Sequence, residues 1–169
     1  TVDIAGTNDA PVVIEDSASA QEDVTYAATG NVLANDSDAD QGTVLAVGAP
    51  GTYAGTYGSL TLAADGSYSY ALANGSAAVQ GLAQDDLVTD VFGYEATDGI
   101  ASTSAALTVS VTGMNDAPVA VADSASAQED LILGASGNVL DNDSDADTGT
   151  VLSVANSGTY AGTYGTFVL

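Results

Sequence analysis

The chain has 169 residues, a formal net charge of −23, and no Lys, Arg, His or Cys. Without cationic side chains it cannot grip nucleic-acid phosphates, so nucleic acid is excluded as a partner, and direct attraction to anionic lipid is equally unfavourable. The lack of cysteine removes disulfides and zinc thiolate sites, which leaves oxygen ligands, the type that Ca²⁺ prefers, as the available metal chemistry.

Six short segments are predicted to be β-strands, because each is rich in β-branched or aromatic residues and is bounded by Gly, Asn, Asp or Pro. In chain order they are residues 12–14, 43–47, 59–62, 67–72, 91–94 and 105–111. Asp65-Gly66 predicts a hairpin turn in which both positions can take φ > 0. Only residues 77–83 indicate a helix, and Gly81 limits it to one or two turns. These features predict an all-β fold, packed as a Greek-key β-sandwich.

The first 62 residues return without a gap as residues 108–169, and about two thirds of the paired positions are identical. This register predicts that residues 1–7 are the final strand of a preceding repeat, 8–112 a complete sandwich, and 113–169 the first part of a further, incomplete repeat. We expect either a longer polypeptide that continues this array or strands from another chain that complete the last sheet. Tandem near-copies usually space, bind or scaffold, and with no His, Lys, Arg or Cys we expect no catalysis.

Each repeat contains a loop of alternating aspartates. The first loop holds Asn35, Asp36, Asp38 and Asp40, and the second holds Asp143, Asp145 and Asp147. Carboxylates spaced by two residues on a tight turn can converge on one Ca²⁺. A solvated acidic turn is the alternative, because Asp and Asn favour turns for local reasons. Two copies in a chain with no cation to neutralise them favour calcium.

Several motifs resemble a known family. Residues 6–12 (Gly-Thr-Asn-Asp-Ala-Pro-Val) and 113–119 (Gly-Met-Asn-Asp-Ala-Pro-Val) resemble the cadherin linker, and residues 96–99 resemble the cadherin Ala-x-Asp-Gly segment. Residues 57–70, followed by 90–99, resemble the VCBS repeat, one of the cadherin-like and bacterial Ig-like modules of large RTX-type secreted adhesins. The resemblance implies a calcium-binding sandwich that extends a secreted protein at the bacterial cell surface.

The resemblance also implies a set of metal ligands at the domain junctions. The implied ligands are Asn8, Asp9, Asp36, Asp38 and Asp40 at one junction, Asn115, Asp116, Asp143, Asp145 and Asp147 at the next, and Glu22, Glu129 and Asp98 as additions. The sequence lacks the second Asn of the cadherin linker and the Asp-Arg-Glu motif. Asp98 could instead be a turn residue beside Gly99, and the two glutamates could be solvated strand ends.

Three functions remain open at this point. The first is a structural extender whose partners are neighbouring repeats of the same polypeptide, with Ca²⁺ stiffening the junctions. The second is a subunit of a filament or surface layer in which other copies of the chain complete the sheet. The third is a glycan-binding module that uses the tyrosines of residues 51–58 and 158–165, although such tyrosines more often cover the end of a sandwich. No apolar run is long enough to insert into a membrane.

Overall fold

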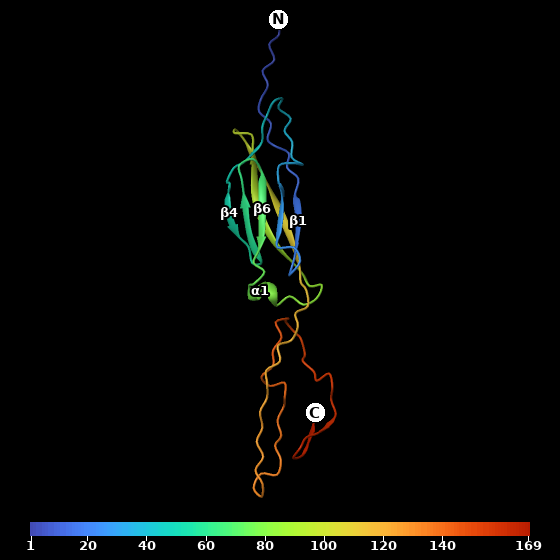
Figure 1. The fold of residues 1–169 in the computed structure, drawn as a ribbon. Coiled ribbons are helices and arrows are strands. Elements are labelled where there is room, and N and C mark those ends of the chain that lie inside the picture. Colours follow the sequence, from blue (N-terminus) through green and yellow to red (C-terminus); the bar gives the residue numbers. More distant parts are fainter. The chain divides into compact units, whose positions relative to one another are not determined.

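The computed structural model describes residues 1–169 and divides them into unit 1 (Thr1–Met114) and unit 2 (Asn115–Leu169). Unit 1 contains two four-stranded sheets that form a β-sandwich (Figure 1). The first sheet has the order β1 (Asp16–Gln21), β8 (Ser102–Thr112), β7 (Leu87–Thr97), β3 (Ala46–Val47). The second has the order β2 (Ala27–Asn31), β6 (Ser67–Leu72), β5 (Gly58–Leu62), β4 (Gly51–Ala54). The predicted all-β sandwich is therefore confirmed.

The core of unit 1 lies between the two sheets. Along β8, Leu107, Val109 and Val111 are fully buried, while Thr108 and Ser110 between them are partly exposed, as the alternating sequence predicts. The rings of Tyr70 and Phe92 meet across the core with centroids 6.1 Å apart. The long antiparallel pairing of β7 with β8 supplies the buried face against which the second sheet packs.

The predicted strands differ from the structure mainly in extent. The segment at 67–72 matches β6, and those at 59–62, 91–94 and 105–111 lie within the longer β5, β7 and β8. The predicted strand at 12–14 is wrong, because Val12 forms only an isolated bridge with Ser37, and the strand at 43–47 is reduced to β3. Strands β1, β2 and β4 were not predicted. Their small and polar residues form strands because a neighbouring strand pairs with them.

The hairpin between β5 and β6 closes on the predicted Asp65-Gly66 pair. The Gly66 amide donates to the Ala63 carbonyl over 3.1 Å, and Gly66 has φ = 84°. The predicted hairpin is confirmed, and of the two residues that can take φ > 0 Gly66 alone is left-handed. The loop between β5 and β6 is longer than a two-residue turn and places the glycine after a regular turn, so that only one residue needs a left-handed conformation.

The carboxylate of Asp65 stabilises this hairpin, and its hydrogen bonds shift the pKa of Asp65. Asp65 Oδ1 accepts hydrogen bonds from the Ser67 hydroxyl (2.6 Å) and amide (3.0 Å), which lower the pKa of Asp65. These bonds stabilise the fold above the ordinary carboxyl pKa of about 3.9, and the stabilisation is lost as the pH falls through the lowered pKa of the folded state.

We expect Ser67→Ala to raise the pKa of Asp65 toward its ordinary value, because the largest cause of the shift is removed. Carboxyl-carbon NMR titration measures this change. Asp98 is the internal control, since the pKa of Asp98 is also lowered but by other donors. Equal titration of Asp65 in the wild type and the variant would contradict the assignment.

The predicted helix is a single turn. Helix α1 spans Ala77–Gln80, with Ser76 as its N-cap: the Ser76 side chain accepts from the Val79 amide. The helix ends before Gly81, so it is shorter than the predicted segment 77–83, and it buries Val79. No helix of the structure is long and apolar enough to cross a membrane.

Unit 2 contains one hairpin, β9 (Thr159–Ala161) with β10 (Thr166–Val168). Its side chains are less covered than their counterparts in unit 1: Phe167 is 52% exposed, whereas Leu60 at the equivalent position is 1% exposed. The bridge between Val119 and Ser144 reproduces the bridge between Val12 and Ser37. The entry segment of each repeat therefore lies along the aspartate loop of that same repeat.

Candidate functional site

The aspartate loop of unit 1 is held against the linker by backbone amides that donate to its carboxylates. The Ile14 amide donates to Asp36 Oδ1 and the Asp9 amide to Asp40 Oδ2, each over 2.9 Å. Within the loop, the Asp40 amide donates to Asp38 Oδ1 over 2.8 Å. Asp36 and Asp40 thus bond to the linker while Asp38 bonds within the loop, so loop and linker form one structure.

Unit 2 repeats this arrangement residue for residue. The Val121 amide donates to Asp143 Oδ1 (2.8 Å), the Asp116 amide to Asp147 Oδ2 (3.1 Å), and the Asp147 amide to Asp145 Oδ1 (2.9 Å). The second copy forms although unit 2 has few strands around it. Its geometry therefore follows from the local sequence of linker and loop.

Asp98 is distant from the linker in the sequence but is hydrogen-bonded to it. Its Oδ2 accepts from the Asn8 side-chain amide over 2.8 Å, while Oδ1 accepts from the backbone amides of Ala101 and Ile100. These donors, led by Ala101, lower the pKa of Asp98. Asp98 thus serves as a turn residue before Gly99, which has φ = 92°, and also contacts the linker.

Two loop carboxylates have a buried oxygen with no hydrogen-bond partner. These atoms are Asp38 Oδ2 and Asp147 Oδ1, and the Asp147 side chain is only 6% exposed. A buried carboxylate oxygen is costly unless a donor or a cation contacts it. No three acidic side chains are gathered in a geometry that could hold a metal ion as the structure stands. The oxygen donors of linker and loop fit Ca²⁺ in chemistry.

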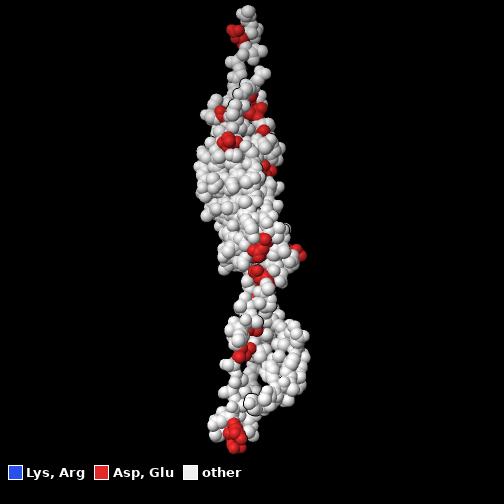
Figure 2. All heavy atoms as spheres, viewed as in Figure 1, with Lys and Arg blue, Asp and Glu red and all other residues white.

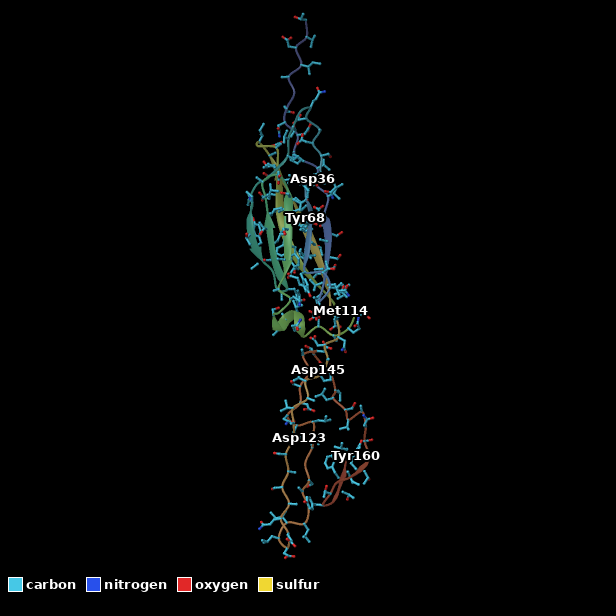
Figure 3. All side chains as sticks on the ribbon, viewed as in Figure 1. Asp36, Tyr68, Met114, Asp123, Asp145 and Tyr160 are labelled. Atoms are coloured by element: carbon cyan, nitrogen blue, oxygen red, sulfur yellow. The ribbon has the colours of Figure 1, made fainter.

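A tyrosine beneath the loop was missed from the sequence. The buried Tyr94 hydroxyl lies 2.9 Å from Asp16 Oδ2, 3.0 Å from the Val32 carbonyl and 3.4 Å from Asp36 Oδ2. Burial, reinforced by the charge of Asp36, raises the pKa of Asp16 despite the hydrogen bond from Tyr94. The sequence feature that could have pointed to this cluster is the recurrence of Asp16 as Asp123 in the second repeat. Figure 3 marks Asp36 and Asp145 in the two loops, and Asp123 in unit 2.

The glutamates have different surroundings. Glu22 is fully buried: Oε1 accepts from the Gln80 side chain (2.9 Å) and Oε2 from the Met114 amide (3.0 Å). The interpretation of Glu22 as a solvated strand end is therefore wrong, because α1 and the chain after β8 cover it. Glu129 is exposed. Glu22 contacts Met114, which follows the end of β8, whereas Asp98 lies in the turn before β8, so the two lie at opposite ends of unit 1.

The surface of unit 1 shows the same division. In the view of Figure 2, acidic atoms gather toward the two ends of unit 1, and few lie over the middle of the sandwich. Tyr53 and Tyr57 are half-buried and pack against the core, as predicted for tyrosines that cover a sandwich, and the Tyr53 hydroxyl donates to the Ala49 carbonyl. On the face shown in Figure 2, the charged groups that could bind a cation lie toward the ends.

Comparison with known proteins matches residues 8–113 to the family described as "Bacterial cadherin-like domain" and residues 115–169 to "Bacterial Ig domain". The calcium-binding lectin RapA2 of Rhizobium johnstonii is 35% identical over 150 residues, which cover 80% of this chain and 61% of RapA2. The chain thus matches less than two thirds of that relative. Domains of these two families are typically structural or adhesive modules rather than enzymes. The fold, the repeated linker and the family match over residues 8–113 together show that the chain belongs to the bacterial cadherin-like domain family.

Proposed function

We propose that the chain is a calcium-binding structural extender of a large extracellular adhesin at the bacterial cell surface. Its partners would be neighbouring repeats of the same polypeptide. The observation that carries the proposal is the pair of buried carboxylate oxygens without partners, Asp38 Oδ2 and Asp147 Oδ1, one in each aspartate loop. The sequence contains no Lys, Arg or His that could neutralise them.

Calcium would supply the missing positive charge and bind several oxygens at once. In unit 1 the proposed ligands come from the linker, from the aspartate loop and from the turn before β8: Asn8, Asp9, Asp36, Asp38, Asp40 and Asp98. In unit 2 they are Asn115, Asp116, Asp143, Asp145 and Asp147. Because linker and loop contact each other in both units, an ion there would tie the linker to the domain it enters and would stiffen the array. Without the ion, the mutual repulsion of the carboxylates would oppose that order.

A thermal melt of the full chain tests this proposal. We expect the melting temperature to rise steeply from excess chelator to millimolar Ca²⁺, and much less with Mg²⁺, which demands a stricter octahedral geometry. An ion at about one hundred times its Kd adds roughly 2.7 kcal/mol to the free energy of unfolding per independent site. Identical melts in chelator and in calcium would refute the proposal.

Loop variants locate the effect. Asp38→Asn combined with Asp40→Asn should abolish most of the calcium-dependent stabilisation of unit 1, because two proposed ligands lose their charge. Glu95→Gln removes an exposed carboxylate from the outer face of β7 and should leave the calcium response unchanged. Equal calcium responses in both variants would show a general charge effect rather than a site.

Carbohydrate binding is a second candidate, favoured by the description of RapA2 as a lectin. Tyr164 is fully exposed in unit 2, while Tyr57 at the equivalent position in unit 1 is half-buried. Saturable binding in a glycan array, lost in Tyr164→Ala and retained in Tyr57→Ala, would support this candidate. Absence of saturable binding would leave the structural role alone.

A further inference from the structure

Strand β7 has a free edge along most of its length. On one side it pairs with β8 from Leu87 to Thr97. On the other side β3 pairs only with Ala96 and Thr97, and the Gly48 amide adds one bond, to the Glu95 carbonyl. Residues 87–94 therefore have β8 as their only strand neighbour, although β7 is not the last strand of the sheet.

The backbone groups at this edge can be assigned. The Glu95 carbonyl points to the β3 side, because it accepts from Gly48. In an antiparallel strand the paired groups alternate, so the amides and carbonyls of Gly93, Val91 and Thr89 point to that same side. No strand covers them there. They form a row of donors and acceptors spaced as an incoming strand requires.

A hollow lies beside Gly93, toward the end of the free row that is nearest β3. It has a volume of about 360 Å³, and its lining includes Tyr53, Gly93, Tyr94 and Ala105. A Cβ atom at Gly93 would meet open space, so the glycine leaves the hollow unfilled. The hydroxyl of Tyr53 is already bonded to the Ala49 carbonyl, which holds the ring in place. One apolar side chain of an added strand could occupy part of this space.

The edge carries few of the features that block strand addition. Within residues 87–94 the only charged side chain is Asp90, which is buried and faces the core. Leu87 and Val91 are exposed on the outer face, and Val91 is 62% exposed. Neither Lys nor Pro interrupts the row, although both are common protections of natural edges.

Charge indicates which strand could dock. Every copy of the chain carries a net charge of −23, so two copies repel each other. Glu95 is exposed at the end of the free row. An extended segment with apolar residues at alternate positions could pair with the backbone row and place one apolar side chain in the hollow. Flanking Lys or Arg would be attracted to the negative charge of the protein.

We propose that the free edge of β7, residues 87–94, binds an extended, positively charged segment of another protein as an added β-strand. This interaction is independent of calcium at the aspartate loops. The bound segment would place one apolar side chain in the hollow beside Gly93 and would continue the β1-β8-β7 sheet.

A synthetic peptide can probe the edge. The sequence of residues 102–112 already pairs with β7 along its whole length, so this sequence with two lysines added at each end is a suitable probe. We expect saturable binding to the full chain by fluorescence anisotropy, with NMR amide shifts concentrated at Thr89, Val91 and Gly93. Replacing the flanking lysines by glutamates should weaken binding at low salt.

Matched variants separate the edge from general charge. Val91→Lys should weaken binding about tenfold or more, because edge lysines oppose strand pairing. Val44→Lys adds the same charge at an 84% exposed valine in the loop before β3 and should change binding less than about twofold. Both substitutions are on the surface, and unchanged thermal melts would confirm that they fold.

Three outcomes would overturn the proposal. They are no saturable binding of the peptide, shifts that map away from β7, and equal binding by the two lysine variants. Sedimentation of the protein alone adds a fourth: self-association that Val91→Lys abolishes would assign the edge to a second copy of the chain.

Discussion

Replacing Asp90 by alanine is expected to destabilise unit 1 by about 3 kcal/mol. The buried Asp90 carboxylate accepts from the amides of Thr56 (2.7 Å) and Tyr57 (3.1 Å) and from the Tyr70 hydroxyl (2.8 Å). Burial and this hydrogen bond also raise the pKa of Tyr70, so its hydroxyl stays protonated as a donor. Alanine would leave that fully buried hydroxyl without an acceptor, while the two loop amides could reach water. Urea denaturation measures the change.

Two further variants show whether the hydrogen bonds are the cause. Asp90→Asn keeps one acceptor oxygen and should cost about half as much as Asp90→Ala. Tyr70→Phe in the Asp90→Ala background removes the orphaned hydroxyl, so the double variant should be less destabilised than the two single effects added together. Strict additivity, or a loss below about 1 kcal/mol for Asp90→Ala, would contradict the network.

Glu22→Ala should also lower the free energy of unfolding of unit 1 by about 3 kcal/mol. The substitution removes two hydrogen bonds to a charged acceptor, from Gln80 and from the Met114 amide, and it leaves a cavity beside α1. The wild-type contact ties β1, the helix and the start of the linker together. Urea denaturation followed by far-UV circular dichroism gives the measurement.

Glu129 provides the matched control, because it is the repeat equivalent of Glu22 and is exposed. Glu129→Ala should change stability by less than about 0.5 kcal/mol. Glu22→Gln keeps the shape and one acceptor oxygen, so it should fall between the wild type and Glu22→Ala. Equal effects at positions 22 and 129 would show that the buried contacts of Glu22 contribute nothing.

The acidic loops and the strands with strict alternation were predictable because their causes are local. In β8 every second residue from Leu107 to Val111 is apolar, and in β6 Tyr70 and Leu72 alternate with polar or small residues. The loop geometry recurs in both units from linker and loop residues alone. Strands β1 and β2 were not predictable, since their Ala, Ser and Gly residues carry little β-preference and depend on a neighbour for pairing.

The repeated octapeptide at 51–58 and 158–165 distinguishes the effect of local sequence from that of tertiary contacts, because its sequence is identical in both units. In unit 1 Tyr57 is half-buried and its amide is bonded to Asp90, whereas Tyr164 is fully exposed. The amino-acid sequence by itself determined the all-β class, the repeat register and the acidic loops, since these follow from side-chain spacing and local turn chemistry. Only the tertiary structure decided the burial of Glu22, the partners of Asp90 and the free edge of β7, since these depend on contacts between residues far apart in the chain.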